Sequence, residues 1–357
     1  MEKTTNSHIK SIDSIKFLFS IIIVYFHLFH VQLRPYLSDS TLFQILTIRT
    51  FSAQLIVECF LITAGYFLFQ TYLNTPKTSI ANFFIKRFFR LWPVFFFYNI
   101  IIYFQTPTTL DELILNISFL HSTGISQNYY GAIWFISPFF WSGLLLFSIL
   151  KSFERNKALI IISLITYFSY CINLNNLQGG VGRHVVYSFL SLAMLRTLGG
   201  LSLGILLGAS QKYLISSKEN TPKNKTLNFI IFSFIELILS SLLLYNFLIY
   251  TIFKNAFTTV VIFLALFYSL TTNSGIISQI LNTQYLSNLG KYSYSIFVMQ
   301  QVSFNILTKT LWQDKNFIYS HTILTIILSV IFAILIGIAT YYLIERPFIK
   351  YYNKKSL

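Results

Sequence analysis

Lys16 and His27 are a pair of residues whose types and spacing could support chemistry. They lie in an apolar run, SIDSIKFLFSIIIVYFHLFH (residues 11–30), which begins with Asp13 and Lys16 and ends with His27 and His30. In an α-helix, eleven residues make three turns plus about 20°, so both side chains share one stripe, about 16 Å apart along the axis. An ionisable group inside a membrane span is costly and typically marks a pathway or a site. The run therefore predicts a titratable base deep in the membrane or, alternatively, an anchoring lysine and a hydrogen-bonded packing histidine.

Glu58 is the second candidate, in the apolar run LIVECFLITAGYF. If successive runs cross the membrane in opposite directions, it lies about 12 Å below the outer edge and His27 lies about 10 Å below it. A buried carboxylate beside an imidazole would orient the ring and make it a competent general base. We therefore expect a His27–Glu58 contact; the alternative is that Glu58 pairs with Arg49 or with another helix.

The segment NFFIKRFFRLWPVFFF contains Lys86, Arg87 and Arg90. The two arginines are three residues apart and so share one helix face, while Pro93 predicts a kink or break. One interpretation is an anchor at the cytoplasmic boundary with an aromatic belt. The other is a phosphate clamp, because guanidinium groups match the oxygens of a phosphate-rich donor.

Trp134, in GAIWFISPFFW, falls at the predicted outer start of the fourth span. An indole there can anchor the helix at the interface or stack on a sugar ring. Trp134 and His30 are our candidate substrate-binding residues.

Composition places the chain among integral membrane proteins. Of its 357 residues 55% are hydrophobic and only 10% are charged, and the mean hydropathy is +0.64. These values exclude an ordinary soluble domain. The first apolar run has no small-residue cleavage site and is read as a retained span. Cys59 and Cys171 form no metal or disulfide pattern, so no metal is expected.

We predict an all-α bundle of about ten transmembrane helices in a single domain over residues 1–357, with no appended soluble domain. The predicted spans are 14–32, 50–70, 84–104, 131–150, 158–174, 185–209, 227–250, 255–272, 289–308 and 321–345. With a cytoplasmic N-terminus, 19 Lys and Arg residues fall inside and 6 outside, so both termini are predicted to be cytoplasmic. This asymmetry explains the net charge of +15 without a nucleic-acid partner.

Glycines at 200, 204 and 208 predict close helix packing around the sixth span. The GxSxG pattern from Gly200 to Gly204 is rejected as a nucleophile elbow, because it lies within an apolar helix and not on a strand-to-helix turn. Pro347, after Glu345 and Arg346, is expected to end the last helix.

Taken together, these motifs resemble the acyltransferase-3 family of bacterial membrane proteins, which O-acylate cell-envelope sugars. The resemblance covers nearly the whole chain, and it rests on the order and spacing of six motifs. They are Lys16 and His27 with the preceding Asp13, Glu58 through Ala64-Gly65-Tyr66, Arg87 and Arg90, the NISFLH block, LGKYSYSIF at 289–297, and YYLIERPF.

Two of the motifs depart from the family pattern, at three positions. An acidic pair is replaced by Phe139 and Phe140, as in a subgroup that includes exopolysaccharide-modification proteins. The histidine that often ends the late motif is Gln300. These departures put the acceptor and the proton relay in doubt.

The resemblance implies a multi-pass enzyme of the inner membrane with acetyl-CoA or another acyl-CoA as donor. Lys86, Arg87 and Arg90 would hold the donor. His27, Glu58, Lys16 and Asp13 would be the catalytic residues, with Lys16 lining the inner half of a cavity. His27 would either take the proton of the sugar hydroxyl or carry the acyl group transiently. The acceptor would be a glycan or lipid-linked saccharide. The other expected partners are membrane lipids and either a second copy of the chain or an envelope-assembly partner. The alternatives are a flippase or exporter of lipid-linked sugar and a non-catalytic assembly protein. A transporter is expected to have internal repeats, and the sequence shows none.

Overall fold

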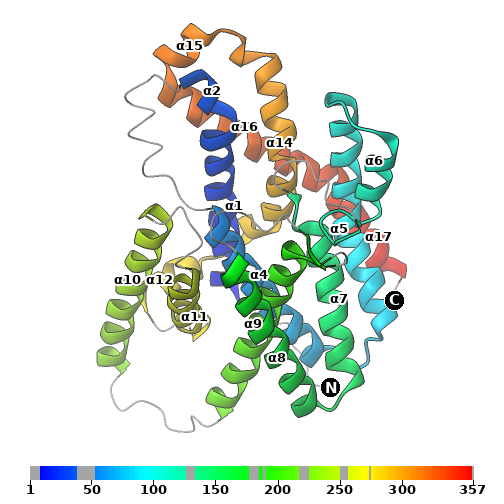
Figure 1. Cartoon of the computed structure of the whole chain (residues 1–357). Helices are drawn as coiled ribbons and strands as arrows, with labels where there is room; N and C mark the ends of the chain where they lie inside the picture. The colour runs from blue at the N-terminus through cyan, green and yellow to red at the C-terminus, as the bar shows by residue number, and fades with distance from the viewer. Residues whose placement is uncertain are drawn as a thin grey trace.

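The chain folds as a bundle of helices (Figure 1). The computed structural model describes residues 9–37, 53–125, 133–176, 185–187, 190–216, 225–249, 256–272 and 275–355. The long helices are α1 (Lys10–His27), α4 (Ala53–Asn74), α5 (Ile80–Gln105), α7 (Ile136–Ser152), α8 (Arg155–Asn176), α9 (Leu192–Ser216), α10 (Lys225–Ile249), α11 (Ala256–Thr272), α14 (Ser293–Lys309) and α16 (Thr322–Thr340).

Shorter elements connect these helices. They are α2 (Arg34–Leu37), α6 (Leu110–Ile117), α12 (Ile276–Leu281), α13 (Gln284–Leu289), α15 (Lys315–Ser320), α17 (Arg346–Lys355) and the 3₁₀ turns η4 (Gly290–Tyr292) and η5 (Leu311–Gln313). One short antiparallel pair, β1 (Val185–Tyr187) and β2 (Leu190–Ser191), precedes α9. The expected helical segment around LILNISFL is α6, whose first turn is closed by a capping box between Thr109 and Glu112.

Each predicted apolar run overlaps one of the long helices. The sixth run was expected to be helical from residue 185, but β1 and β2 come first and α9 begins only at Leu192. Among the described residues, five helices are long and apolar enough to cross a membrane: α4, α5, α9, α10 and the continuous helix through α16 and α17. α7 and α11 are apolar but shorter. The structure therefore supports a multi-pass membrane protein, while the count of ten spans and the orientation of the termini stay predictions.

Two helices pass through π-helical turns, η1 (Leu28–Leu33) directly after His27 and η6 (Tyr341–Glu345) directly before Arg346. π-turns inside α-helices are rare and occur frequently at functional sites. Our expectation that Pro347 ends the last helix is wrong. Pro347 instead lies inside the helix that continues from α16 through η6 into α17, two residues after the π-helical turn.

We expected a kink or a break at Pro93. The break does not occur, because α5 continues through Pro93. A proline in a packed helix can be tolerated when neighbouring groups satisfy the freed backbone.

α4 and α9 pack with their backbones in direct contact. A Cβ atom added at Gly65 would collide with the backbone of Leu201, and one added at Gly204 would collide with the backbone of Ile62. The glycines thus allow the two backbones to touch, as the GxxxG spacing predicts. Gly200 and Gly204 lie within α9, which confirms the rejection of a nucleophile elbow.

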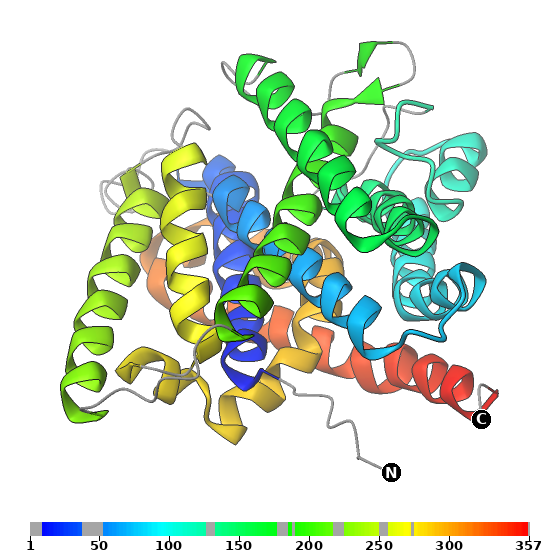
Figure 2. The same cartoon turned by 90° about the horizontal axis from the view of Figure 1, so that it is seen from below.

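The other helices surround this pair and α1. α10 and α11 form one flank, and α5, α6 and α7 form the opposite one (Figures 1 and 2). The apolar window of α9 is 78% buried inside the protein and that of α10 only 11%, which is the pattern expected of a central helix and a lipid-facing one.

Candidate active site

One end of α1 is held rigidly by neighbouring elements. Ser11 donates a hydrogen bond to the carbonyl of Leu270 (2.9 Å), and Ser14 donates to that of Leu281 (2.6 Å). Gly290 packs so closely on the backbone of Asp13 that a side chain there would collide with it. The late motif LGKYSYSIF therefore buttresses the first helix, although the two are far apart in sequence.

Lys16 and Asp13 form an ion pair on this end of α1, with Nζ 2.7 Å from Oδ1. The ammonium group also lies 4.1 Å from the ring centroid of Phe67 on α4. Burial with a carboxylate and an aromatic face keeps a cation favourable in an apolar setting. The sequence-predicted stripe from Lys16 to His27 is confirmed to the extent that one uninterrupted helix carries both residues.

His27 is oriented by Gln300 on α14, whose amide group is buried. Gln300 Nε2 donates to the backbone carbonyl of Phe297 (2.8 Å), so Oε1 faces His27, with 3.1 Å to Nδ1. Because an amide oxygen can only accept, the imidazole must carry its proton on Nδ1. Nε2 is then the accepting nitrogen of the neutral ring, which is the form that a general base needs.

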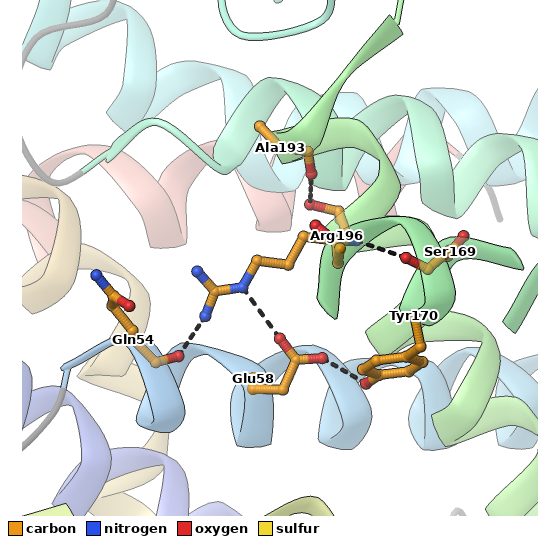
Figure 3. Close-up of polar contacts among 8 residues, drawn as sticks. Gln54, Glu58, Ser169, Tyr170, Ala193 and Arg196 are labelled. Carbon is orange, nitrogen blue, oxygen red and sulfur yellow. Dashed lines mark hydrogen bonds and ion pairs between the residues drawn. The ribbon is translucent and has the colours of Figure 1, made fainter. Parts of the chain in front are cut away.

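Glu58 does not serve as the orienting group for His27. Its carboxylate accepts hydrogen bonds from Tyr170 on α8 (Oη to Oε1, 2.5 Å) and from Arg196 on α9 (Nε to Oε2, 3.1 Å), as Figure 3 shows. Arg196 also donates to the carbonyl of Gln54. The expected His27–Glu58 contact is therefore wrong, and the alternative that Glu58 pairs with another helix is confirmed. Arg49, the other alternative partner, lies outside the described residues.

Trp134 packs against Arg196, the partner of Glu58, and does not lie on an open surface. Its side chain is 7% exposed, and the Arg196 guanidinium lies 5.3 Å from its ring centroid. This packing differs from both sequence interpretations, an interfacial anchor and an exposed sugar platform. Its contribution is to fix the start of α7 against the ion pair. The backbone of His30 lies in η1, and its side chain is outside the described residues.

The two arginines of α5 have different environments. Arg87 donates from Nη2 to the carbonyl of Phe139 on α7 (2.7 Å), and its guanidinium stacks 4.2 Å from the ring centroid of the same residue. Arg90 and Lys86 are exposed. We expected Arg87 and Arg90 to form a phosphate clamp. Arg87 is instead used in helix packing, and Arg90 is the arginine that can meet a ligand. Phe139, which replaces an acid of the family pattern, is the platform for Arg87.

Arg90 faces ionisable side chains from three other elements. It interacts electrostatically with Lys16 on α1, Tyr294 on α14 and Glu345 in η6. Glu345 is buried and accepts a hydrogen bond from Ser295 (2.5 Å), while Tyr294 donates to the carbonyl of Leu91 (2.7 Å). The motifs at residues 289–297 and 341–348 therefore converge on the same end of α1 as Lys16.

A second histidine, His121, holds the loop between α6 and α7. Its Nε2 donates to the carbonyl of Ile133 (3.3 Å), and Ser137 donates to its Nδ1 (2.6 Å). Burial lowers the pKa of His121 to about 4, so the ring is neutral at physiological pH. The pair is fully enclosed and packs against Phe95, which fits a structural role.

Sequence reasoning missed four participating residues: Tyr170, Arg196 as the partner of Glu58, Gln300 as the partner of His27, and Glu345. Arg196 and Glu345 carried a usable signal, because each is an ionisable group in or beside an apolar run. Among the described residues, no group of three His, Cys, Asp or Glu side chains could hold a metal ion.

A family model described as an acyltransferase domain matches residues 9–342. No curated protein and no solved structure matches the chain. The match runs from the first residue of the described bundle to η6, so it includes the helices that carry His27, Glu58, Arg90 and Gln300.

Proposed function

The chain belongs to the acyltransferase-3 family, and we propose that it is a membrane O-acyltransferase of the cytoplasmic membrane. In this proposal it moves an acetyl group from cytosolic acetyl-CoA to a hydroxyl of a cell-envelope or exported glycan. The family supports the acyltransferase activity. The donor, the acceptor and the residue roles are our inference from the arrangement of charged and titratable groups.

The observation that carries the proposal is the pairing of His27 with Gln300. His27 donates its Nδ1 proton to Gln300 Oε1 at 3.1 Å, so the lone pair of the neutral ring is on Nε2, and in this proposal Nε2 takes the proton of an acceptor hydroxyl. The hydroxyl oxygen attacks the thioester carbonyl, the carbon–sulfur bond breaks, and the departing thiolate takes the proton back from the imidazolium. Gln300 stabilises that imidazolium through the same hydrogen bond.

The donor would enter at the opposite end of α1. Arg90 and Lys86 are exposed cations on α5, and Lys16 lies on α1 within electrostatic reach of Arg90. Cations there suit the phosphates of acetyl-CoA. Lys16 and His27 are about 16 Å apart along a straight helix. The extended pantetheine arm of acetyl-CoA suits this span, because the phosphates can stay at Arg90 while the thioester reaches His27.

Glu58 and Arg87 have supporting roles in this proposal. The Glu58–Arg196–Tyr170 cluster joins α4, α8 and α9 beside the helix that carries the base. Arg87 joins α5 to α7. Asp13 holds the Lys16 ammonium group in place.

Acetyl transfer in isolated membranes tests the proposal against the flippase alternative. Membranes receive acetyl-CoA labelled in the acetyl group, and label on the envelope glycan is measured for wild type, His27→Ala and Arg90→Ala. We expect His27→Ala to abolish labelling and Arg90→Ala to raise the KM for acetyl-CoA. If His27→Ala labels glycan normally but reduces glycan export, a flippase or exporter is the better assignment.

A further inference from the structure

Three carboxamide side chains form a hydrogen-bonded series near the His27 end of the bundle. Gln301 Nε2 donates to Asn305 Oδ1 (3.0 Å), and Asn305 Nδ2 donates to Gln105 Oε1 (2.8 Å). Gln301 and Asn305 lie one turn apart on α14, and Gln105 is the last residue of α5. We call these three residues the amide ladder, and we propose that it binds the glycan acceptor through its sugar hydroxyls.

The chemistry of the ladder matches a sugar hydroxyl, which both donates and accepts. All three side chains are half-buried, so they are preorganised and still reachable. Among the described residues, neither the amide nitrogen of Gln105 nor the amide oxygen of Gln301 has a hydrogen-bond partner. The ladder therefore offers donors at one end and an acceptor at the other. It carries no charge, which suits a neutral saccharide better than a phosphate.

The position of the ladder fits the proposed reaction. Gln300, the partner of His27, directly precedes Gln301, and Asn305 lies about 7.5 Å further along α14. α14 lies between α1 and α5 (Figure 1), so the base and the ladder are on adjoining helices. A distance of this size is comparable to one sugar unit, so one hydroxyl can meet His27 while others of the same or the next unit meet the ladder.

The half-burial of the three amides, together with the Gln105 nitrogen and the Gln301 oxygen that their mutual bonds leave unused, indicates a polar surface that water and a sugar can reach. The inference rests on the proposed function, because the acceptor is a glycan only if the enzyme acts on one.

A matched control is present in the same chain. Gln284 donates to Asn288 on α13 with the same i,i+4 spacing and the same 3.0 Å distance as the Gln301–Asn305 bond. This pair is exposed, lies before η4 near the Asp13 end of α1, and has no connection to a third amide among the described residues. Asn288→Leu thus repeats the chemical change of Asn305→Leu at a different place.

The test is steady-state kinetics on the full chain in nanodiscs, with acetyl-CoA and oligosaccharides released from the native envelope glycan. Asn305→Leu and Gln105→Leu are each expected to raise the acceptor KM about tenfold, or about 1.4 kcal/mol. The KM for acetyl-CoA and kcat should stay within about twofold. Asn288→Leu should change nothing. An unchanged acceptor KM in both ladder variants, or an equal increase in Asn288→Leu, overturns the proposal.

Direct binding separates failure of the ladder from failure of the proposed function. If wild type transfers no acetyl group, the proposed function fails, and the ladder is judged by binding of the same oligosaccharides without acetyl-CoA. Binding that is lost in Asn305→Leu and kept in Asn288→Leu and His27→Ala supports the ladder. Equal binding by wild type and Asn305→Leu, or no binding by wild type, overturns it.

Discussion

Replacing Gln300 by leucine tests the link between the base and the residue that orients it. The change keeps a side chain of similar size on α14 but removes the oxygen that accepts the Nδ1 proton of His27 at 3.1 Å. The imidazole then loses the interaction that selects its tautomer and holds its ring. The backbone of α14 should be unaffected, because the lost Gln300–Phe297 bond involves a side-chain donor.

The size of the effect follows from the burial of the pair. Gln300 is 1% exposed and His27 is half-buried, so water only partly replaces the bond that the imidazole N–H loses. Leaving such a group unsatisfied costs about 1–3 kcal/mol, which corresponds to about 5- to 150-fold in rate. We therefore expect Gln300→Leu to lower kcat about 10- to 100-fold. His27→Ala removes the base itself and should lower kcat about 10²- to 10⁴-fold.

A double-mutant cycle gives the decisive comparison. If Gln300 acts only through His27, the double variant His27→Ala/Gln300→Leu should be within about threefold of His27→Ala alone. Gln300→His, which introduces the residue expected here from the family resemblance, offers a ring nitrogen as acceptor and should keep kcat within about tenfold of wild type. Ser303→Ala, which removes another buried side-chain bond on α14, serves as the control. A full additional loss from Gln300→Leu in the His27→Ala background would refute the reasoning.

Three further predictions concern the scaffold and are measured by unfolding of the detergent-solubilised protein. Glu58→Ala leaves Arg196 buried without a carboxylate and should lower the free energy of unfolding by about 3–5 kcal/mol. Glu154→Ala, at an exposed ion pair, should lower it by less than about 1 kcal/mol. Equal losses in the two variants would contradict this prediction. Gly204→Ala should lower the free energy of unfolding by about 1–3 kcal/mol, because the new methyl group meets the backbone of α4. The methyl group of Gly199→Ala meets only side chains, so the loss should be smaller. A larger loss in Gly199→Ala would be contrary evidence. Burial lowers the pKa of His121 to about 4, so between about pH 6.5 and pH 4 the unfolded state binds a proton that the folded state does not. Stability should fall there by up to about 1.4 kcal/mol per pH unit as pH is lowered, and His121→Asn should remove this contribution; an unchanged slope in His121→Asn would rule it out.

The helices were predictable because long apolar runs and few charges leave little other choice in a membrane. In the described part of the chain each predicted run overlaps a long helix, although β1 and β2 replace the start of the 185–209 run. The glycine spacing at residues 200–208 correctly predicted close packing. The two prolines were less informative. Pro93 lies within a helix that continues, and Pro347 lies inside the helix it was expected to end.

The partners of the site residues were harder to predict, because depth in a membrane does not specify which way a side chain points. His27 and Glu58 were placed at similar depth, yet Glu58 faces α8 and α9, and His27 faces α14. Charge complementarity would have helped, since Arg196 is an arginine within an apolar run and needs an acidic partner.

The partner of Gln300 could not be predicted from the sequence. Its departure from the family pattern was visible in the sequence, but 273 residues separate it from His27, and only the packing of α1 on α14 brings the two side chains together. Packing of α5 on α7 likewise separates the roles of Arg87 and Arg90. Three residues apart on α5, they share a face by spacing, yet Arg87 donates to the backbone of α7 and Arg90 stays exposed.

Sidedness of acetyl transfer is the most direct test of the account, because a single helix is proposed to connect a cytoplasmic donor site with a base that serves an external acceptor. Labelled acetyl-CoA is given to sealed vesicles with either the cytoplasmic or the external face outward, carrying wild type or His27→Ala. We predict label on glycan only when the cytoplasmic face meets acetyl-CoA, and none with His27→Ala. Equal labelling from both faces, or full labelling with His27→Ala, would contradict the central claim.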